Sequence, residues 1–233
     1  TPVRRITRSA DKGTHRFTWN LRYHYPSPVD IGRGDFNATK GSNSGTMVMP
    51  GTYKVSMDLV ARGEITRLAD PVAFNAEPLI VNTLAADDRE ALVAFQQKVT
   101  KLSRVFMGMD RKLNEDLARI ASLKQAALGT PEADLSLQVR ITKVERELED
   151  LRYALHGPSA AASWEELPPM EMPLNRRLNV AVYKHWSNSA GLSRIAVEQF
   201  NILREEFPPL VDRLHAAEAE IEAIGAELES VGA

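Results

Sequence analysis

The residues that could bind a metal or a receptor gather in one segment, between Tyr23 and Met49. Asp30, Asp35 and Asn37 offer the hard oxygen atoms that Ca²⁺ prefers, but their spacing matches no EF-hand loop. The same segment contains Arg33-Gly34-Asp35, an integrin-binding tripeptide, and Asn37-Ala38-Thr39, which fits the glycosylation pattern. Three-residue matches arise by chance. We therefore interpret this Gly-, Ser-, Pro- and Asn-rich segment as a solvated loop.

Catalytic patterns are equally sparse. The adjacent Glu165 and Glu166 could suggest the two carboxylates of a glycosidase, but such an enzyme needs these groups about 5–9 Å apart across a cleft. No nucleophile elbow or phosphate-binding glycine loop stands out. The five histidines show no HExxH or paired spacing: His15, His24, His156, His185 and His215. We predict no catalytic, cofactor-binding or metal-binding residue.

A charged run follows in residues 140–152. It interleaves four acidic residues with four basic ones: Glu145, Glu147, Glu149 and Asp150 with Arg140, Lys143, Arg146 and Arg152. Opposite charges three or four positions apart lie together on a helix surface. The run therefore indicates a solvated helix face rather than an acidic binding site.

The composition is that of an ordinary soluble globular protein, with 43% hydrophobic and 26% charged residues among 233. No apolar run approaches the ~20 residues of a membrane span. The chain has no cysteine, which excludes disulfides, zinc–thiolate sites and cysteine nucleophiles. Residues 1–82 carry 11 basic and 7 acidic residues, and the remainder carries 18 and 24. Neither part is basic enough to indicate nucleic-acid binding.

Long helices dominate the second part of the chain. In residues 86–128 apolar residues recur every three or four positions, opposite a charged face, which predicts one long helix. Similar seams predict helices over 131–155, with Thr130 as N-cap, over 174–186 and up to about 231. The last seam keeps its phase across Pro208-Pro209, so we expect a kink or a restart there without an inserted loop. Such seams are typical of helical bundles.

Residues 1–82 show β patterns. Alternation puts Phe17, Trp19, Leu21 and Tyr23 on one face of a strand over 14–23, and a second strand is expected over 52–59. Arg62-Gly63 indicates a hairpin turn into 64–68, with further extended segments at 72–81 and 3–8. We expect Trp19 and Tyr53 to be core residues between two sheets, alongside Val55 and Met57.

Two of these segments carry a resemblance. Residues 13–23 and 49–55 resemble the Ig-like domain of flagellar hook-capping proteins. They are also similar to the C-terminal region of large secreted bacterial proteins with sortilin-like or BNR-repeat β-propellers, often labelled glycosyl hydrolases. In those proteins a helical segment follows the Ig-like module. The resemblance implies a periplasmic or extracellular location and an upstream β-propeller domain as partner.

These observations predict an α+β protein of two domains, an Ig-like β-sandwich over 1–82 and an antiparallel α-helical bundle over 83–233. The chain does not begin with Met and offers four or five strands where such a sandwich has about seven. We therefore expect a piece of a longer product that starts inside its β domain and leaves a sheet edge unpaired.

Three functions remain open. The first is a non-catalytic accessory or interaction region of a larger secreted or periplasmic β-propeller protein. The second is a part of a glycoside hydrolase or peptidase whose active site lies in the propeller. The third is a module that forms homo-oligomers through its helices. Partners of the nucleic-acid class and a membrane span are not expected.

Overall fold

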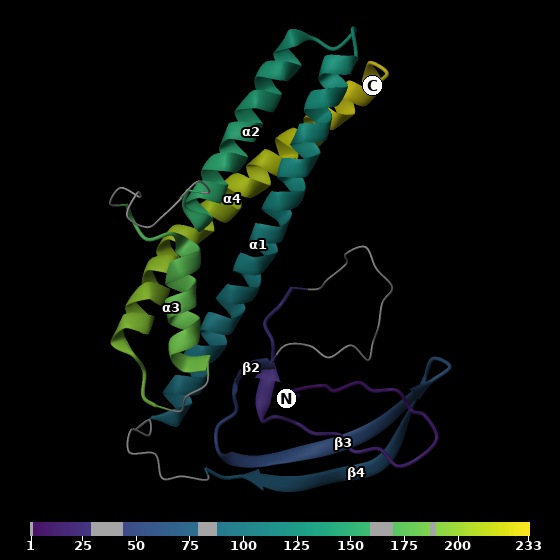
Figure 1. Ribbon diagram of the computed structural model, residues 1–233, viewed down its shortest axis with the longest axis vertical. Helices are drawn as coiled ribbons and strands as arrows, with labels where there is room; N and C mark the ends of the chain where they lie inside the picture. Colours follow the sequence, from purple (N-terminus) through teal and green to yellow (C-terminus); the bar gives the residue numbers. More distant parts are fainter. Residues whose placement is uncertain (1, 29–43, 79–87, 159–169, 187–189) are drawn as a thin grey trace. The chain divides into compact units, whose positions relative to one another are not determined.

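The protein combines strands and helices in an α+β arrangement (Figure 1). This computed structural model describes residues 2–28, 44–78, 88–158, 170–186 and 190–233. The chain divides into two compact units. One contains Thr1–Lys98 and Tyr183–Leu192, and the other contains Val99–Val182 and Ser193–Ala233. We call them the β unit and the helical unit and describe each by itself.

The strands of the β unit form two separate antiparallel pairs. Strand β1 (Arg22–His24) pairs with β2 (Ser44–Met47), and β3 (Gly51–Ala61) pairs with β4 (Glu64–Ala76). The described strands therefore form no closed sandwich. The segment between Tyr23 and Met49 was expected to be a loop, yet its last part supplies β2 because residues 44–47 pair with β1.

Two predicted strands are wrong. Of the strand predicted over 14–23, only residues 22 and 23 lie in a strand, β1, and residues 14–21 form none. Leu21, at a φ of 55°, interrupts the extended run just before β1. Residues 3–8 form no strand either, and Arg4 instead donates a side-chain hydrogen bond to the carbonyl oxygen of Tyr23 at 3.2 Å. Alternation in the sequence was present in residues 14–21, but no backbone ladder holds either segment.

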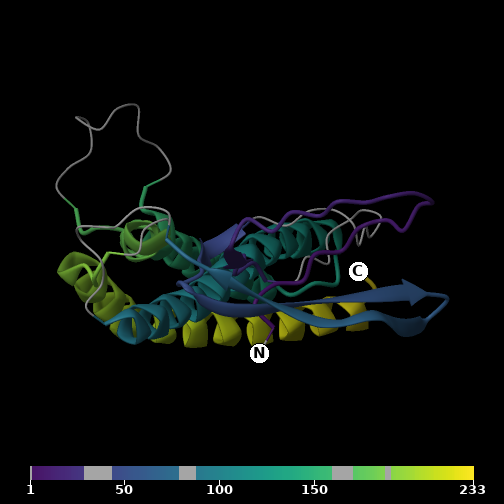
Figure 2. The same ribbon diagram turned by 90° about the horizontal axis from the view of Figure 1, so that it is seen from below.

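The hairpin turn at Arg62-Gly63 is confirmed. Both residues have positive φ values, 54° and 83°, as a two-residue type I′ turn requires. Strand β4 joins the segments predicted over 64–68 and 72–81 into one strand that ends at Ala76, and residues 79–81 lie outside the described residues. Register shifts opposite Val55–Asp58 accommodate the extra residues of β4 around Pro71. Figure 2 shows the two hairpin strands running side by side to this turn.

The four predicted helices are present. They are α1 (Arg89–Gly129), α2 (Leu135–His156), α3 (Leu174–Trp186) and α4 (Arg194–Ser230). Helix α4 continues through Pro208 and Pro209, so no loop is inserted there, as predicted.

The start of α2 differs from the prediction. Its N-cap is Asp134 rather than Thr130, because the Asp134 carboxylate accepts a hydrogen bond from the Ser136 amide at 2.6 Å. Hydrogen bonding from Ser136, first from its side chain and then from its backbone amide, lowers the pKa of Asp134. Thr130 instead donates its hydroxyl hydrogen bond to the carbonyl oxygen of Ala126. The end expected at residue 155 is confirmed to within one residue, since α2 ends at His156 and Gly157 follows at a φ of 79°.

A seven-residue period builds the core of the helical unit. Phe106, Leu113, Ile120 and Ala127 of α1 are buried at successive multiples of seven, and so are Phe207, Leu214, Ile221 and Leu228 of α4. Six α2 residues complete the same cluster: Leu137, Ile141, Val144, Leu148, Leu151 and Leu155. A period of 3.5 residues per turn keeps one seam facing its neighbours, which is the packing of coiled coils.

The helix directions refine the expected antiparallel arrangement. Helix α2 runs against α4, since Arg140 pairs with Glu220 and Arg213 pairs with Glu147 (Figure 1). Helix α1, however, runs in the same direction as α4, as the pairs Lys112–Glu218 and Arg119–Glu222 show. Helix α3 begins beside the end of α2, where Asn175 contacts His156, and ends beside the start of α1, where the carbonyl oxygen of His185 accepts a hydrogen bond from Gln96. It therefore continues the direction of α2, and α4 turns back to run with α1 (Figure 1).

Candidate interaction surface

The β3–β4 hairpin presents one apolar face, which we call the hairpin face. Residues opposite each other in an antiparallel pair lie on the same face, and residues two apart in a strand do too. Tyr53 pairs with Phe74 and Val55 pairs with Val72. Continuing the alternation along β3, the hairpin face consists of Tyr53, Val55, Met57, Leu59, Val72 and Phe74. The pairs Lys54–Ala73 and Asp58–Arg67 lie on the opposite face.

Half of the residues of the hairpin face lack cover. Val55 is 55% exposed, Met57 is 48% exposed and Val72 is 62% exposed. A two-stranded hairpin is at best marginally stable in water by itself. Contiguous exposed apolar side chains mark interaction sites more often than scattered ones do. The hairpin face is therefore the candidate functional surface.

Trp19 covers one end of this face. Its ring meets the Tyr53 ring edge-on at a centroid distance of 5.5 Å and the Phe74 ring at 6.1 Å. The Trp19 Nε1 donates a hydrogen bond to the carbonyl oxygen of Arg22 at 2.9 Å, and the Tyr53 hydroxyl donates one to that of Met49 at 2.6 Å. Partial burial raises the pKa of Tyr53, and electrostatic repulsion from Tyr23 adds a smaller contribution.

The expectation of a sandwich core around Trp19 and Tyr53 is therefore only partly met. The two rings pack together, but both side chains are half-buried. Phe17, Leu21, Val55 and Met57 were expected to share that core and are exposed instead. The reason is that no second sheet covers them among the described strands.

The β1–β2 pair is attached to helix ends within the β unit. Arg22 Nη1 donates to the carbonyl oxygen of Trp186 at 2.9 Å, and the ring of Tyr25 lies edge-on to that of Trp186. Met49 packs against Leu92 in a small buried cluster. This end of the unit is anchored, whereas the hairpin face is not.

A buried histidine lies beside this anchor. His185 is 2% exposed and meets the Phe95 ring edge-on at 5.4 Å. Its carbonyl oxygen accepts a hydrogen bond from Gln96 Nε2 at 3.0 Å, and burial lowers the pKa of its imidazole. A neutral imidazole can pack against an aromatic ring without burying a charge, so the contact of His185 with Phe95 is one of packing.

The other candidate residues that the sequence suggested divide into two groups. Asp30, Arg33-Gly34-Asp35, Asn37-Ala38-Thr39 and the pair Glu165-Glu166 lie outside the described residues. Three of the other histidines, His15, His24 and His215, are exposed. His156 of α2 pairs with Asp110 of α1 at 2.6 Å and with Asn175 of α3 at 3.1 Å, so its two ring nitrogens connect three helices.

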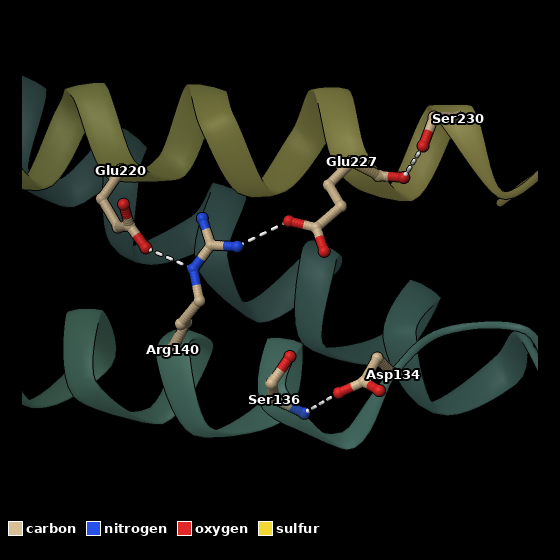
Figure 3. Close-up of polar contacts among 6 residues, drawn as sticks. All are labelled: Asp134, Ser136, Arg140, Glu220, Glu227 and Ser230. Atoms are coloured by element: carbon tan, nitrogen blue, oxygen red, sulfur yellow. Dashed lines mark hydrogen bonds and ion pairs between the residues drawn. The ribbon is translucent and has the colours of Figure 1, made fainter.

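The charged run is a solvated helix face that also joins helices, as its pattern indicated. Arg140 Nε and Nη1 lie 2.6 Å from carboxylate oxygens of Glu220 and Glu227, as Figure 3 shows beside the Asp134–Ser136 cap. Glu145 pairs with Lys124 of α1 at 2.6 Å. The three side chains of the Arg140 pairs are each 34–42% exposed, so each pair contributes less than ~1 kcal/mol.

Within the described ranges, no three His, Asp or Glu side chains are grouped as metal ligands would be. No helix in those ranges is both long enough and apolar enough to cross a membrane. Comparisons of the chain with family models, curated proteins and solved structures gave no match, so the resemblance of residues 13–23 and 49–55 stays a prediction.

Proposed function

We propose that this chain is a non-catalytic accessory region of a larger secreted or periplasmic protein, and that the hairpin face binds the β-propeller domain of the same protein. The single observation that carries the binding role is the uncovered apolar face of β3 and β4. The propeller partner rests on the resemblance of residues 13–23 and 49–55 to proteins with that architecture.

The energetics support cover by a partner. Fully burying a Val or Met side chain contributes roughly 1.5–3 kcal/mol. Val55, Met57 and Val72 are each about half exposed or more, so a partner on this face would gain stabilisation from all three. In the proposed arrangement the partner completes the two-layer structure that the Ig-like pattern implies.

Thiol labelling tests this proposal, because the chain has no cysteine of its own. Val72→Cys places one thiol on the hairpin face. Val139→Cys places one on α2, where the side chain is 70% exposed against 62% at Val72. The rate of alkylation at each labelled peptide is measured by mass spectrometry, once in this chain alone and once in the full-length protein.

We expect the Val72→Cys thiol to react at least about tenfold more slowly in the full-length protein, while the Val139→Cys thiol reacts equally in both. Equal rates at Val72→Cys would reject the hairpin face as the binding surface. Protection in a full-length protein that lacks propeller repeats would keep the surface and reject the propeller as its partner.

A further inference from the structure

A carboxylate occupies the apolar seam of α1. Leu113 is 0% exposed and Ile120 is 1% exposed, and Asp116 lies between them at spacings of three and four. This spacing puts all three on the buried stripe of the helix. Asp116 is 1% exposed, as deeply buried as its leucine and isoleucine neighbours.

The Lys112 ammonium forms ion pairs with two carboxylates, those of Asp116 and Glu218. Lys112 Nζ lies 2.7 Å from Asp116 Oδ1 and 3.2 Å from Glu218 Oε1 of α4. The second oxygen of Asp116, Oδ2, is buried and has no hydrogen-bond partner in the described part of the chain. An ionised carboxylate with one oxygen in this state loses hydration that its partners do not replace.

The charged groups around Asp116 come from α1 and α4. Lys112 and Arg119 of α1 favour the ionised carboxylate, while Glu218 of α4 opposes it. Arg119 is itself held by Glu222 of α4 at 2.5 Å. The buried seam of α2 is apolar throughout its length: Leu137, Ile141, Val144, Leu148, Leu151 and Leu155.

Burial outweighs the cations, so the pKa of Asp116 is raised above its ordinary value, with Glu218 adding to the rise. A group with a raised folded-state pKa contributes stability that is complete below its unfolded-state pKa. That contribution is lost as the pH rises through the folded-state value. Stability therefore falls as the pH rises, which is the reverse of the pH dependence that an ordinary salt-bridged aspartate gives.

We propose that protonation of Asp116 strengthens the contact between α1 and α4 and thereby makes the helical unit more stable. Protonation removes the buried charge and the repulsion from Glu218. It also leaves the Lys112 ammonium to pair with Glu218 alone, across the contact between α1 and α4. In its ionised form Asp116 competes for that ammonium.

The test compares the full chain with Asp116→Asn, which cannot ionise, and with Asp116→Leu, which restores an apolar seam. Helical circular dichroism during urea unfolding gives the folding equilibrium constant of each protein between pH 7.5 and pH 4.5. Glu115→Gln is the matched control, since it removes one acidic charge from an exposed neighbour on α1.

At pH 7.5 we expect at least one neutral variant to shift the folding equilibrium constant about tenfold or more toward the folded state relative to the parent, because replacing a buried charged group by a neutral one that packs well is often stabilising by this order. The advantage should shrink as the pH falls to 4.5, and Glu115→Gln should follow the parent.

If the amide introduced by Asp116→Asn lacks hydrogen-bond partners and lowers stability for that reason, Asp116→Leu still measures the effect of removing the buried charge. Two neutral variants that are both less stable than the parent at pH 7.5 would show that Asp116 acts as an ordinary ion-pair partner and would overturn the proposal. A variant advantage that does not change with pH would overturn it as well.

Discussion

Burial governs the two titratable side chains that lie deepest in the described chain, Asp116 and His185. Both environments favour the neutral form, because little water reaches either group. The pH dependences that follow are opposite. Neutral Asp116 is the protonated form and is favoured by acid, whereas neutral His185 is the deprotonated form and is disfavoured by acid.

His185 gives a prediction for the β unit. A histidine with a lowered pKa contributes stability that is present above its unfolded-state pKa of about 6.5 and is lost as the pH falls through the lowered value. We expect His185→Phe, which keeps an aromatic ring against Phe95, to lose less stability than the parent between pH 7 and pH 5. Denaturation followed by tryptophan fluorescence measures this. His215→Gln, at an exposed position, should keep the parent's pH dependence.

Trp19 gives a second prediction at the residue scale. Removing a large aromatic side chain from a full core costs about 3–5 kcal/mol. Because Trp19 is half-buried, we expect Trp19→Ala to lower the free energy of unfolding by a smaller amount, about 2 kcal/mol. Phe17→Ala is the control, because Phe17 is 46% exposed and its loss should change stability by less than ~0.5 kcal/mol. Equal effects of the two substitutions would contradict the role of Trp19 as cover for Tyr53 and Phe74.

At the scale of elements, helix α4 tolerates two prolines because its seam does not change phase around them. Phe207 and Leu214 are buried on the two sides of Pro208 and Pro209, while both prolines are exposed. Each proline lacks the amide donor that the helix interior needs. The helix is therefore maintained by packing rather than by local propensity at this point.

The prolines can be tested directly. Replacing both Pro208 and Pro209 with Ala restores two donors without touching the seam, and Pro costs ~3 kcal/mol relative to Ala in a helix interior. We expect the double variant to be more stable by at least ~1 kcal/mol in chemical denaturation. Glu206→Ala, at an exposed position in the preceding turn, should have little effect. A destabilised double variant would mean that the prolines relieve strain in α4.

At the scale of the whole molecule, the two units bury their apolar residues very unequally. The helical unit contains one continuous cluster of buried apolar residues, including Leu148, Leu151 and Ile221. In the β unit, Val60, Ile65 and Val72 of the hairpin remain 62–74% exposed. Local stability follows buried apolar contacts, so it should differ sharply between the two.

Hydrogen exchange measures that difference. We expect amides of residues 51–76 to exchange through openings of lower free energy than amides of residues 137–155, although both segments have regular backbone hydrogen bonds. In the full-length protein, the proposed partner should slow exchange in residues 51–76 and leave residues 137–155 unchanged. Slower exchange in the hairpin than in α2 of this chain alone would contradict this account.

Periodicity in the sequence determined the helices and one turn. The apolar seams of α2 and α4 predict their residues closely, because 3.6 residues per turn is a local property of the backbone. Arg62-Gly63 predicts its turn for a similarly local reason, since Gly63 accepts a positive φ freely. The same seam logic could have indicated Asp116, which occupies the next position of the stripe after Leu113.

The tertiary structure alone decided which faces are covered. Alternation shows that Val55, Met57 and Val72 share a face, but the cover of that face depends on segments distant in the chain. It also decided that Asp116 is buried beside Glu218, one hundred and two positions away, and that α1 and α4 run in the same direction. These features arise from contacts between remote residues, and a local repeat in the sequence carries no information about which remote residues meet.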